Sequence, residues 1–100
     1  KELIDKCHQK GIAVILDMVL NHAEEEFPYV KMYPLNANPM FNATPTHPFN
    51  VFRDFNHDSN FTKQIVKNVN EFWLREYKFD GYRFDLSKGF TQNAQCNNKE

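Results

Sequence analysis

The sequence lacks long apolar runs, has only three glycines and two cysteines, and carries a net charge of −1. No stretch approaches the roughly 20 apolar residues that a membrane-spanning helix needs, and no signal peptide is recognisable at the start. Cys7 and Cys96 show no metal-ligand spacing and do not decide the redox compartment. The near-neutral charge gives no support to a nucleic-acid or membrane partner.

Aromatic residues, in contrast, are abundant, with 15 in 100 residues. They indicate large buried surfaces or a stacking site. Apolar spacing predicts a helix over 1–10 that ends at Gly11, and a helix over 60–77. The continuous apolar run 12–16 predicts a strand buried on both faces, as in parallel sheets, and 82–86 predicts a second short strand.

Residues 23–58 form a long excursion without a helical or strand period. It holds all five prolines and many aromatics, so we expect it to be ordered and functional rather than disordered. Two buried strands joined through a helix make a βαβ unit, which cannot cover both faces of its own strands. Residues 1–100 therefore read as part of a larger α/β domain, and the isolated chain is expected to self-associate through unpaired strand edges.

An aspartate lies at the end of each predicted strand, where a parallel barrel carries its active site. Asp17 follows the first strand, and Asp85 lies near the end of the second. Alternation places Arg83 and Asp85 on the same side of that strand, within an apolar wall. The guanidinium would hold Asp85 ionised and oriented, which suits a nucleophile better than a general acid. The polar side chains that follow the two strands are Asn21, His22 and Lys88.

Three short motifs carry a family resemblance. DMVLNH at 17–22 and GYRFDLSKG at 81–89 resemble the first and second signatures of the α-amylase family of glycoside hydrolases. RDFN at 53–56 resembles the short signature near the end of that family's small B domain. The three occur in the family's order, and together they span most of the chain.

The resemblance implies a (β/α)₈ TIM barrel. The chain would contribute the third strand, the B-domain excursion over 23–58, the third helix and the fourth strand. It also implies retaining cleavage, or transfer, at α-1,4-glucosidic bonds of an α-glucan oligo- or polysaccharide. Export of many glucan-degrading relatives implies an extracellular or periplasmic location.

The resemblance also assigns roles by position. Asp85 would be the nucleophile, Arg83 its electrostatic partner, and Asp17 a brace acting through Arg83. His22 would bind the sugar in the cleaved subsite, and Lys88 would reach the leaving-group sugar. Asn21 and Asp54 match positions that often bind a structural calcium, and both side chains carry oxygen atoms that can act as calcium ligands.

The chain departs from the family pattern at one motif position, and two family residues fall outside it. Gly89 stands where the second signature often has histidine. The family's acid/base glutamate and a third essential aspartate lie on later strands, beyond Glu100. A retaining glycosidase needs two carboxyl groups about 5–5.5 Å apart, so we expect the 100-residue chain alone to have no hydrolase activity.

Other interpretations stay open at this point. The protein could be a non-catalytic sugar-binding scaffold on the same barrel, a transglycosylase, or a zinc hydrolase using Asp17, His22 and Asp85. Asp85 could be only an ion-pair partner of Arg83, and the strand-end polar residues could be structural. The excursion histidines His47 and His57 are structural by default, since no histidine pair has tight metal-ligand spacing.

Overall fold

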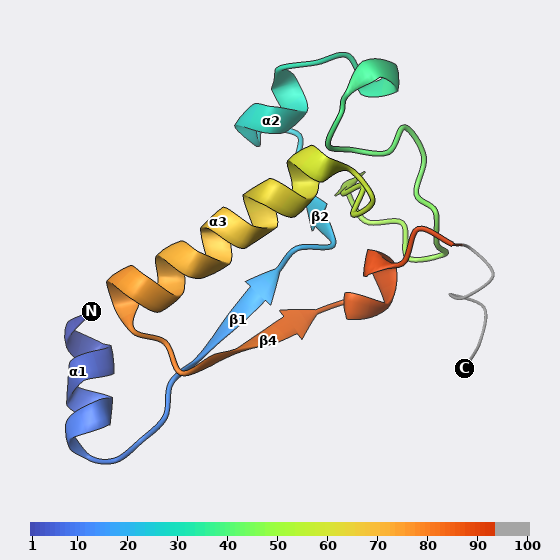
Figure 1. Ribbon diagram of the computed structural model, residues 1–100. Helices are drawn as coiled ribbons and strands as arrows, with labels where there is room; N and C mark the ends of the chain where they lie inside the picture. The colour runs from blue at the N-terminus through green and yellow to red at the C-terminus, as the bar shows by residue number, and fades with distance from the viewer. Residues whose placement is uncertain (94–100) are drawn as a thin grey trace.

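A computed structural model describes residues 1–93 of the chain. Its elements are α1 (Glu2–Gln9), β1 (Ile15–Val19), β2 (His22–Ala23), α2 (Pro28–Lys31), the 3-10 turn η1 (Leu35–Ala37), β3 (Arg53–Asp54), α3 (Asn60–Tyr77), β4 (Gly81–Asp85) and the 3-10 turn η2 (Ser87–Phe90). Strands β1 and β4 run parallel, and both point toward the excursion (Figure 1). Cys96 lies outside the described residues.

The two long helices form where the sequence predicts them. Helix α3 has the predicted bounds, and Ser59 is its N-cap, although the Ser59 side chain makes no capping hydrogen bond. Helix α1 ends one residue before the predicted limit. Gly11 follows with φ of +72°, a left-handed conformation that glycine adopts without the steric cost of a side chain.

The first strand, in contrast, begins three residues later than predicted. The ladder pairs Ile15 with Gly81 and Asp17 with Arg83, so Asp17 lies in the middle of β1 rather than after its end. The prediction of a strand over 12–16 is wrong in its bounds. An apolar run indicates which side chains are candidates for burial. The limits of the strand are instead set by its backbone pairing with β4.

The best-buried core belongs to the excursion and not to the strand pair. Met40, Phe41 and Phe55 are buried together, and the ring centroids of Phe41 and Phe55 lie 4.3 Å apart. An isolated antiparallel bridge joins the same two phenylalanines. The residues that pack around this core are Ala23, Phe27, Val30 and Ile65. The excursion is therefore an ordered unit attached to the first half of α3.

The β1–β4 pair is poorly covered in this chain. Ile15 and Val19 are 56% and 46% exposed, and Phe72 of α3 is also exposed. The exposure of β1 agrees with the expectation that a βαβ unit cannot cover both faces of its own strands. Two strands and one helix offer too little surface to cover one another.

A carboxylate joins the elements at the opposite end of the strands. Asp80 Oδ2 accepts hydrogen bonds from the Val14 amide at 2.7 Å and from His8 Nε2 at 2.8 Å. The Val14 amide, and after it His8, hold the pKa of Asp80 below its usual value. This contact connects the end of α1 and the entry of β1 to the entry of β4.

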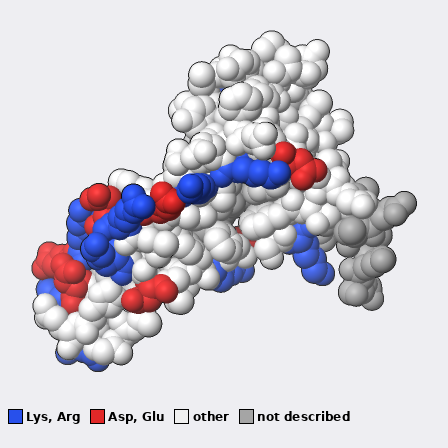
Figure 2. Space-filling model, in the orientation of Figure 1, with Lys and Arg blue, Asp and Glu red and all other residues white. Residues whose placement is uncertain are grey.

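Charged side chains are interleaved over the visible face of α1 and α3 (Figure 2). Two of the ion pairs are i,i+4 pairs along a helix, Lys6 with Glu2 and Arg75 with Glu71. No helix within residues 1–93 is long and apolar enough to cross a bilayer.

The exposed sheet predicts association of the isolated 100-residue chain. We expect analytical ultracentrifugation to show species above the 11.9 kDa monomer, because apolar strand faces and unpaired edges seek partners. Ile15→Lys should shift the population toward monomer. Met32→Lys, at an exposed residue after α2 and away from the sheet, is the matched control. A chain that stays monomeric at every concentration contradicts the expectation.

Candidate active site at the strand ends

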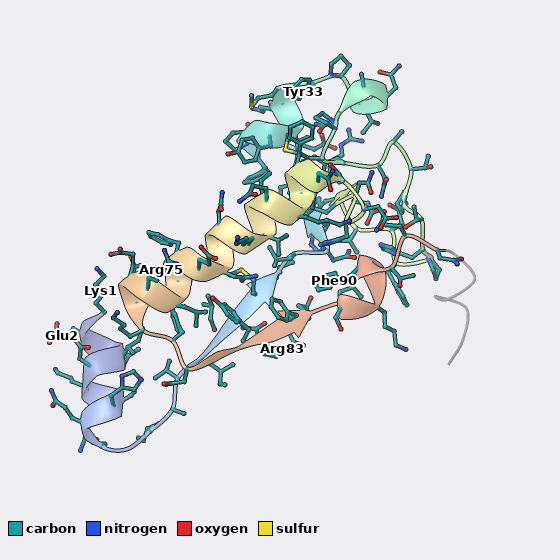
Figure 3. The ribbon with its side chains drawn as sticks, viewed as in Figure 1. Lys1, Glu2, Tyr33, Arg75, Arg83 and Phe90 are labelled. Atoms are coloured by element: carbon teal, nitrogen blue, oxygen red, sulfur yellow. The ribbon has the colours of Figure 1, made fainter. Side chains whose placement is uncertain are left out.

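One guanidinium connects the two neighbouring strands. Arg83 Nη1 lies 2.9 Å from Asp17 Oδ1 and 2.8 Å from Asp85 Oδ1. Arg83 and Asp85 are two residues apart on β4 and so share a face, while Asp17 is the register partner of Arg83 on β1. The contacts that the sequence predicts for Arg83 are present, and Figure 3 marks its position on β4.

The three side chains are more accessible than predicted. Between 41% and 68% of each is exposed, so an apolar wall does not enclose them within the described residues. Hydrogen bonds to Asp17 and then to Asp85 raise the pKa of Arg83 above its usual range. Both carboxylates accept charge-assisted hydrogen bonds from Arg83, which orient them.

This arrangement supports one chemical role and disfavours another. An ionised carboxylate with a fixed orientation can act as a nucleophile. A general acid must instead carry a proton, and a carboxylate bonded to a guanidinium is poorly suited to holding one. The orientation of Asp85 by Arg83 is therefore compatible with the predicted nucleophile role.

The backbone turns sharply after Asp85. Leu86 has φ of +48°, a left-handed conformation that is strained for a branched residue, and η2 follows directly. This turn leaves Asp85 as the last residue of β4. Lys88 lies in η2 with an exposed side chain, and its ammonium makes no ion pair with residues 1–93.

His22 lies apart from the Arg83 group. It opens β2, pairs with Asp54 of β3, and has its Nδ1 3.3 Å from Asn21 Nδ2. Its ring centroid is 5.7 Å from that of Phe52, and it lines an apolar cavity of about 450 Å³. Within the described residues, no hydrogen bond joins His22 to Arg83 or Asp85, so its sugar-binding role stays a prediction.

Asn21 and Asp54 lie in a buried polar cluster, which also contains a histidine from the excursion. His47 Nε2 is 2.8 Å from Asp54 Oδ1, and the two side chains are 0% and 2% exposed. A Cβ on Gly89 would lie 1.7 Å from Asn21 Oδ1 and 2.8 Å from His47 Nε2. Sequence reasoning left His47 without a role, because its partners come from separate segments and no short motif joins them.

The predicted calcium ligands do not offer an open site. Both carboxylate oxygens of Asp54 already have donors, His47 Nε2 on Oδ1 and Asn42 Nδ2 on Oδ2 at 2.7 Å. Asn21 Oδ1 is buried and has no hydrogen-bond partner in the part of the chain that is described. Among the side-chain oxygens of Asn21 and Asp54, only Asn21 Oδ1 is therefore without a donor, whereas calcium takes six to eight oxygens. The observed donor set does not fit calcium.

The zinc interpretation also gains no support. Within residues 1–93, no three His, Cys, Asp or Glu side chains are grouped so that they could hold a metal ion. The histidine and two aspartates proposed for such a site, His22, Asp17 and Asp85, do not converge.

His57 attaches the excursion to the end of β1. His57 Nε2 donates to the Leu20 carbonyl oxygen at 2.7 Å. The centroid of its ring lies 4.6 Å from that of Phe90 in η2, with the two rings tilted. Burial lowers the pKa of His57 below 6.5, and the bond to Leu20 opposes this shift only in part. Burial therefore favours the neutral ring, whereas the bond to the Leu20 carbonyl favours the protonated ring.

Replacing Gly89 tests the close approach around it. Gly89→Ala should lower the free energy of unfolding by about 1–3 kcal/mol, because the new Cβ overlaps the buried Asn21 amide. Gly81→Ala is the matched control, since its Cβ would meet only the flexible Ile15 Cδ1 at 3.3 Å. Urea unfolding measures both variants, and equal losses would contradict the packing described.

The lowered pKa of His57 predicts a loss of stability in acid. Between pH 6.5 and the lower folded value, the unfolded chain binds more protons than the folded one. The free energy of unfolding should therefore fall as pH drops below 6.5. His57→Gln keeps a donor for Leu20 but does not titrate, so urea unfolding across pH should give it a flatter slope. Identical slopes would show that His57 does not contribute.

Comparisons with known proteins agree with the motifs. A family model described as "Alpha amylase, catalytic domain" matches residues 1–41. The chain is 33% identical over 93% of its length to the 1,4-alpha-glucan-branching enzyme 2-2, chloroplastic/amyloplastic, of Arabidopsis thaliana. It is 29% identical, over 87% of its length, to a maltogenic alpha-amylase of Bacillus acidopullulyticus. It is 33% identical, over 86% of its length, to a pullulanase of Bacillus subtilis (strain 168).

The chain spans only a small part of these relatives, 13%, 18% and 12% of their respective lengths. The matches nevertheless cover most of the chain itself, and they include the segment that carries DMVLNH. The family model and these relatives support the assignment of the chain to the α-amylase family.

Proposed function

We propose that this chain carries the nucleophile of an enzyme that acts on α-1,4-glucosidic bonds with retention of configuration. The observation that supports this most is the Arg83 guanidinium, bonded to Asp85 and braced by Asp17. Residues 1–100 would form part of a (β/α)₈ barrel, and 23–58 its B-domain-like excursion. The parallel β1–β4 pair, joined through α3, is compatible with neighbouring barrel strands.

The chemistry would proceed in two displacements. An Asp85 carboxylate oxygen attacks the anomeric carbon, the glucosidic C–O bond breaks, and the leaving oxygen takes a proton from a general acid. The product is a glucosyl ester of Asp85. A water molecule or a sugar hydroxyl then attacks the same carbon, gives its proton to the acid residue's conjugate base, and releases Asp85.

The remaining residues would position Asp85 and the sugar. Arg83 would orient Asp85 before attack, and Asp17 would fix Arg83 from the neighbouring strand. The required acid is neither Asp17 nor Asp85, so it comes from another residue of the protein. His22 would contact the sugar in the cleaved subsite, and Lys88, exposed on η2, would contact the leaving-group sugar.

Glucan is the substrate class that the relatives favour. Their names include a maltogenic amylase, a pullulanase and branching enzymes, so they cover both hydrolysis and chain transfer. Transfer is therefore a second candidate outcome for the same Asp85 intermediate. Retention of the Arg83–Asp85 pair favours either enzyme over a scaffold that binds glucan without chemistry.

Substitution of the nucleophile tests the proposal. In the protein that carries this chain, Asp85→Asn should reduce turnover of an end-blocked maltoheptaoside by about 10³-fold or more, because an amide cannot form the ester. Asp58→Asn, outside the Arg83 group, is the matched control. Product analysis by chromatography separates hydrolysis from transfer.

Each contrary outcome has a distinct meaning. Equal turnover by Asp85→Asn and the unmodified protein would remove Asp85 as nucleophile. Glucan binding without turnover in either protein would favour the scaffold.

A further inference from the structure

The buried side chain of His47 has both ring nitrogens engaged. Its Nδ1 accepts a hydrogen bond from the Phe49 amide at 3.1 Å. Because Nδ1 accepts, the proton of the neutral ring lies on Nε2, which donates to Asp54 Oδ1 at 2.8 Å. The imidazole therefore has no free lone pair to offer a metal ion.

Its partner Asp54 connects the excursion to the end of β1. Asp54 lies in β3, which pairs with β2 directly after that strand end, and the next amide, Phe55, donates to the Asn21 carbonyl at 3.0 Å. The carboxylate is buried, so leaving either oxygen without a donor would be costly. His47 and Asn42 supply one donor to each oxygen.

Gly89 provides the space in which this cluster forms. Asn21 Oδ1 and His47 Nε2 both lie within 2.8 Å of the point that a Cβ on residue 89 would occupy. The end of β1, the excursion and η2 after β4 thus meet at one buried place. Figure 3 shows η2, with Phe90, directly beneath the excursion.

We infer that the His47 Nε2 proton takes the place of a divalent cation at this junction. It gives Asp54 Oδ1 the donor that a buried carboxylate oxygen requires, as a hydrogen bond rather than a metal–ligand bond. The junction between the excursion and the two strand ends is therefore independent of calcium. This inference stands whether or not the protein cleaves glucan.

Local hydrogen exchange tests the inference in the protein that carries this chain. Mass spectrometry of peptides from residues 40–56 should give the same exchange rates in EDTA and in calcium chloride. In the His47→Ala variant, the amides of residues 40–56 should exchange about tenfold faster or more in both solutions, because Asp54 loses a buried donor. His47→Gln, which keeps an N–H near Nε2, should recover most of the protection.

The matched control is His8→Ala. His8 makes a pair of the same kind and length with Asp80, but the two side chains are 35% and 41% exposed. Its loss should leave residues 40–56 unchanged.

Two results would overturn the inference. One is slower exchange of the unmodified protein in calcium than in EDTA, with calorimetry showing calcium binding, which would place a cation at the junction. The other is unchanged protection in His47→Ala. If His47→Ala fails to fold, the comparison of the unmodified protein and His47→Gln in EDTA and calcium still decides between hydrogen bond and cation.

Discussion

The candidate active site depends on one guanidinium held between two parallel strands. Arg83 bonds Asp85 on its own strand and Asp17 on the neighbouring strand. The contact with Asp17 therefore depends on the register in which β1 pairs with β4. A slip of one residue between the strands would break the contact of Arg83 with Asp17, whereas Arg83 and Asp85 share a face of β4 in any register. The contact with Asp80 at the strand entries helps to hold that register.

A second constraint is the attachment of the excursion. Its aromatic core packs against the first half of α3, and three polar contacts place it on the strand ends. These are His57 on Leu20, Phe55 on Asn21, and the His47–Asp54 pair beside Gly89. Those strand ends carry Asp85 and His22. The excursion therefore does more than lengthen the chain, because it fixes the backbone from which the candidate residues project.

Local sequence rules predicted what depends on neighbours along the chain. Two-residue alternation placed Arg83 beside Asp85, and helical spacing gave α3 its bounds. The same rules misplaced β1 by three residues, since its limits depend on a strand more than 60 positions away. The role of His47 was missed for the same reason: its environment combines residues from the end of β1, β3 and η2. The exposure of the strands was predicted from the topology, but apolar composition does not tell which partner covers each face.

The most direct test of Asp85 as nucleophile is covalent trapping. The protein that carries this chain would be incubated with a ring-fluorinated α-maltosyl fluoride, which forms a glycosyl ester rapidly and releases it slowly. Peptide mass spectrometry would then locate the sugar. We expect the adduct on Asp85, and its absence from Asp17. An adduct on another carboxylate, from a protein that turns the reagent over, would contradict the role that we assign to Asp85.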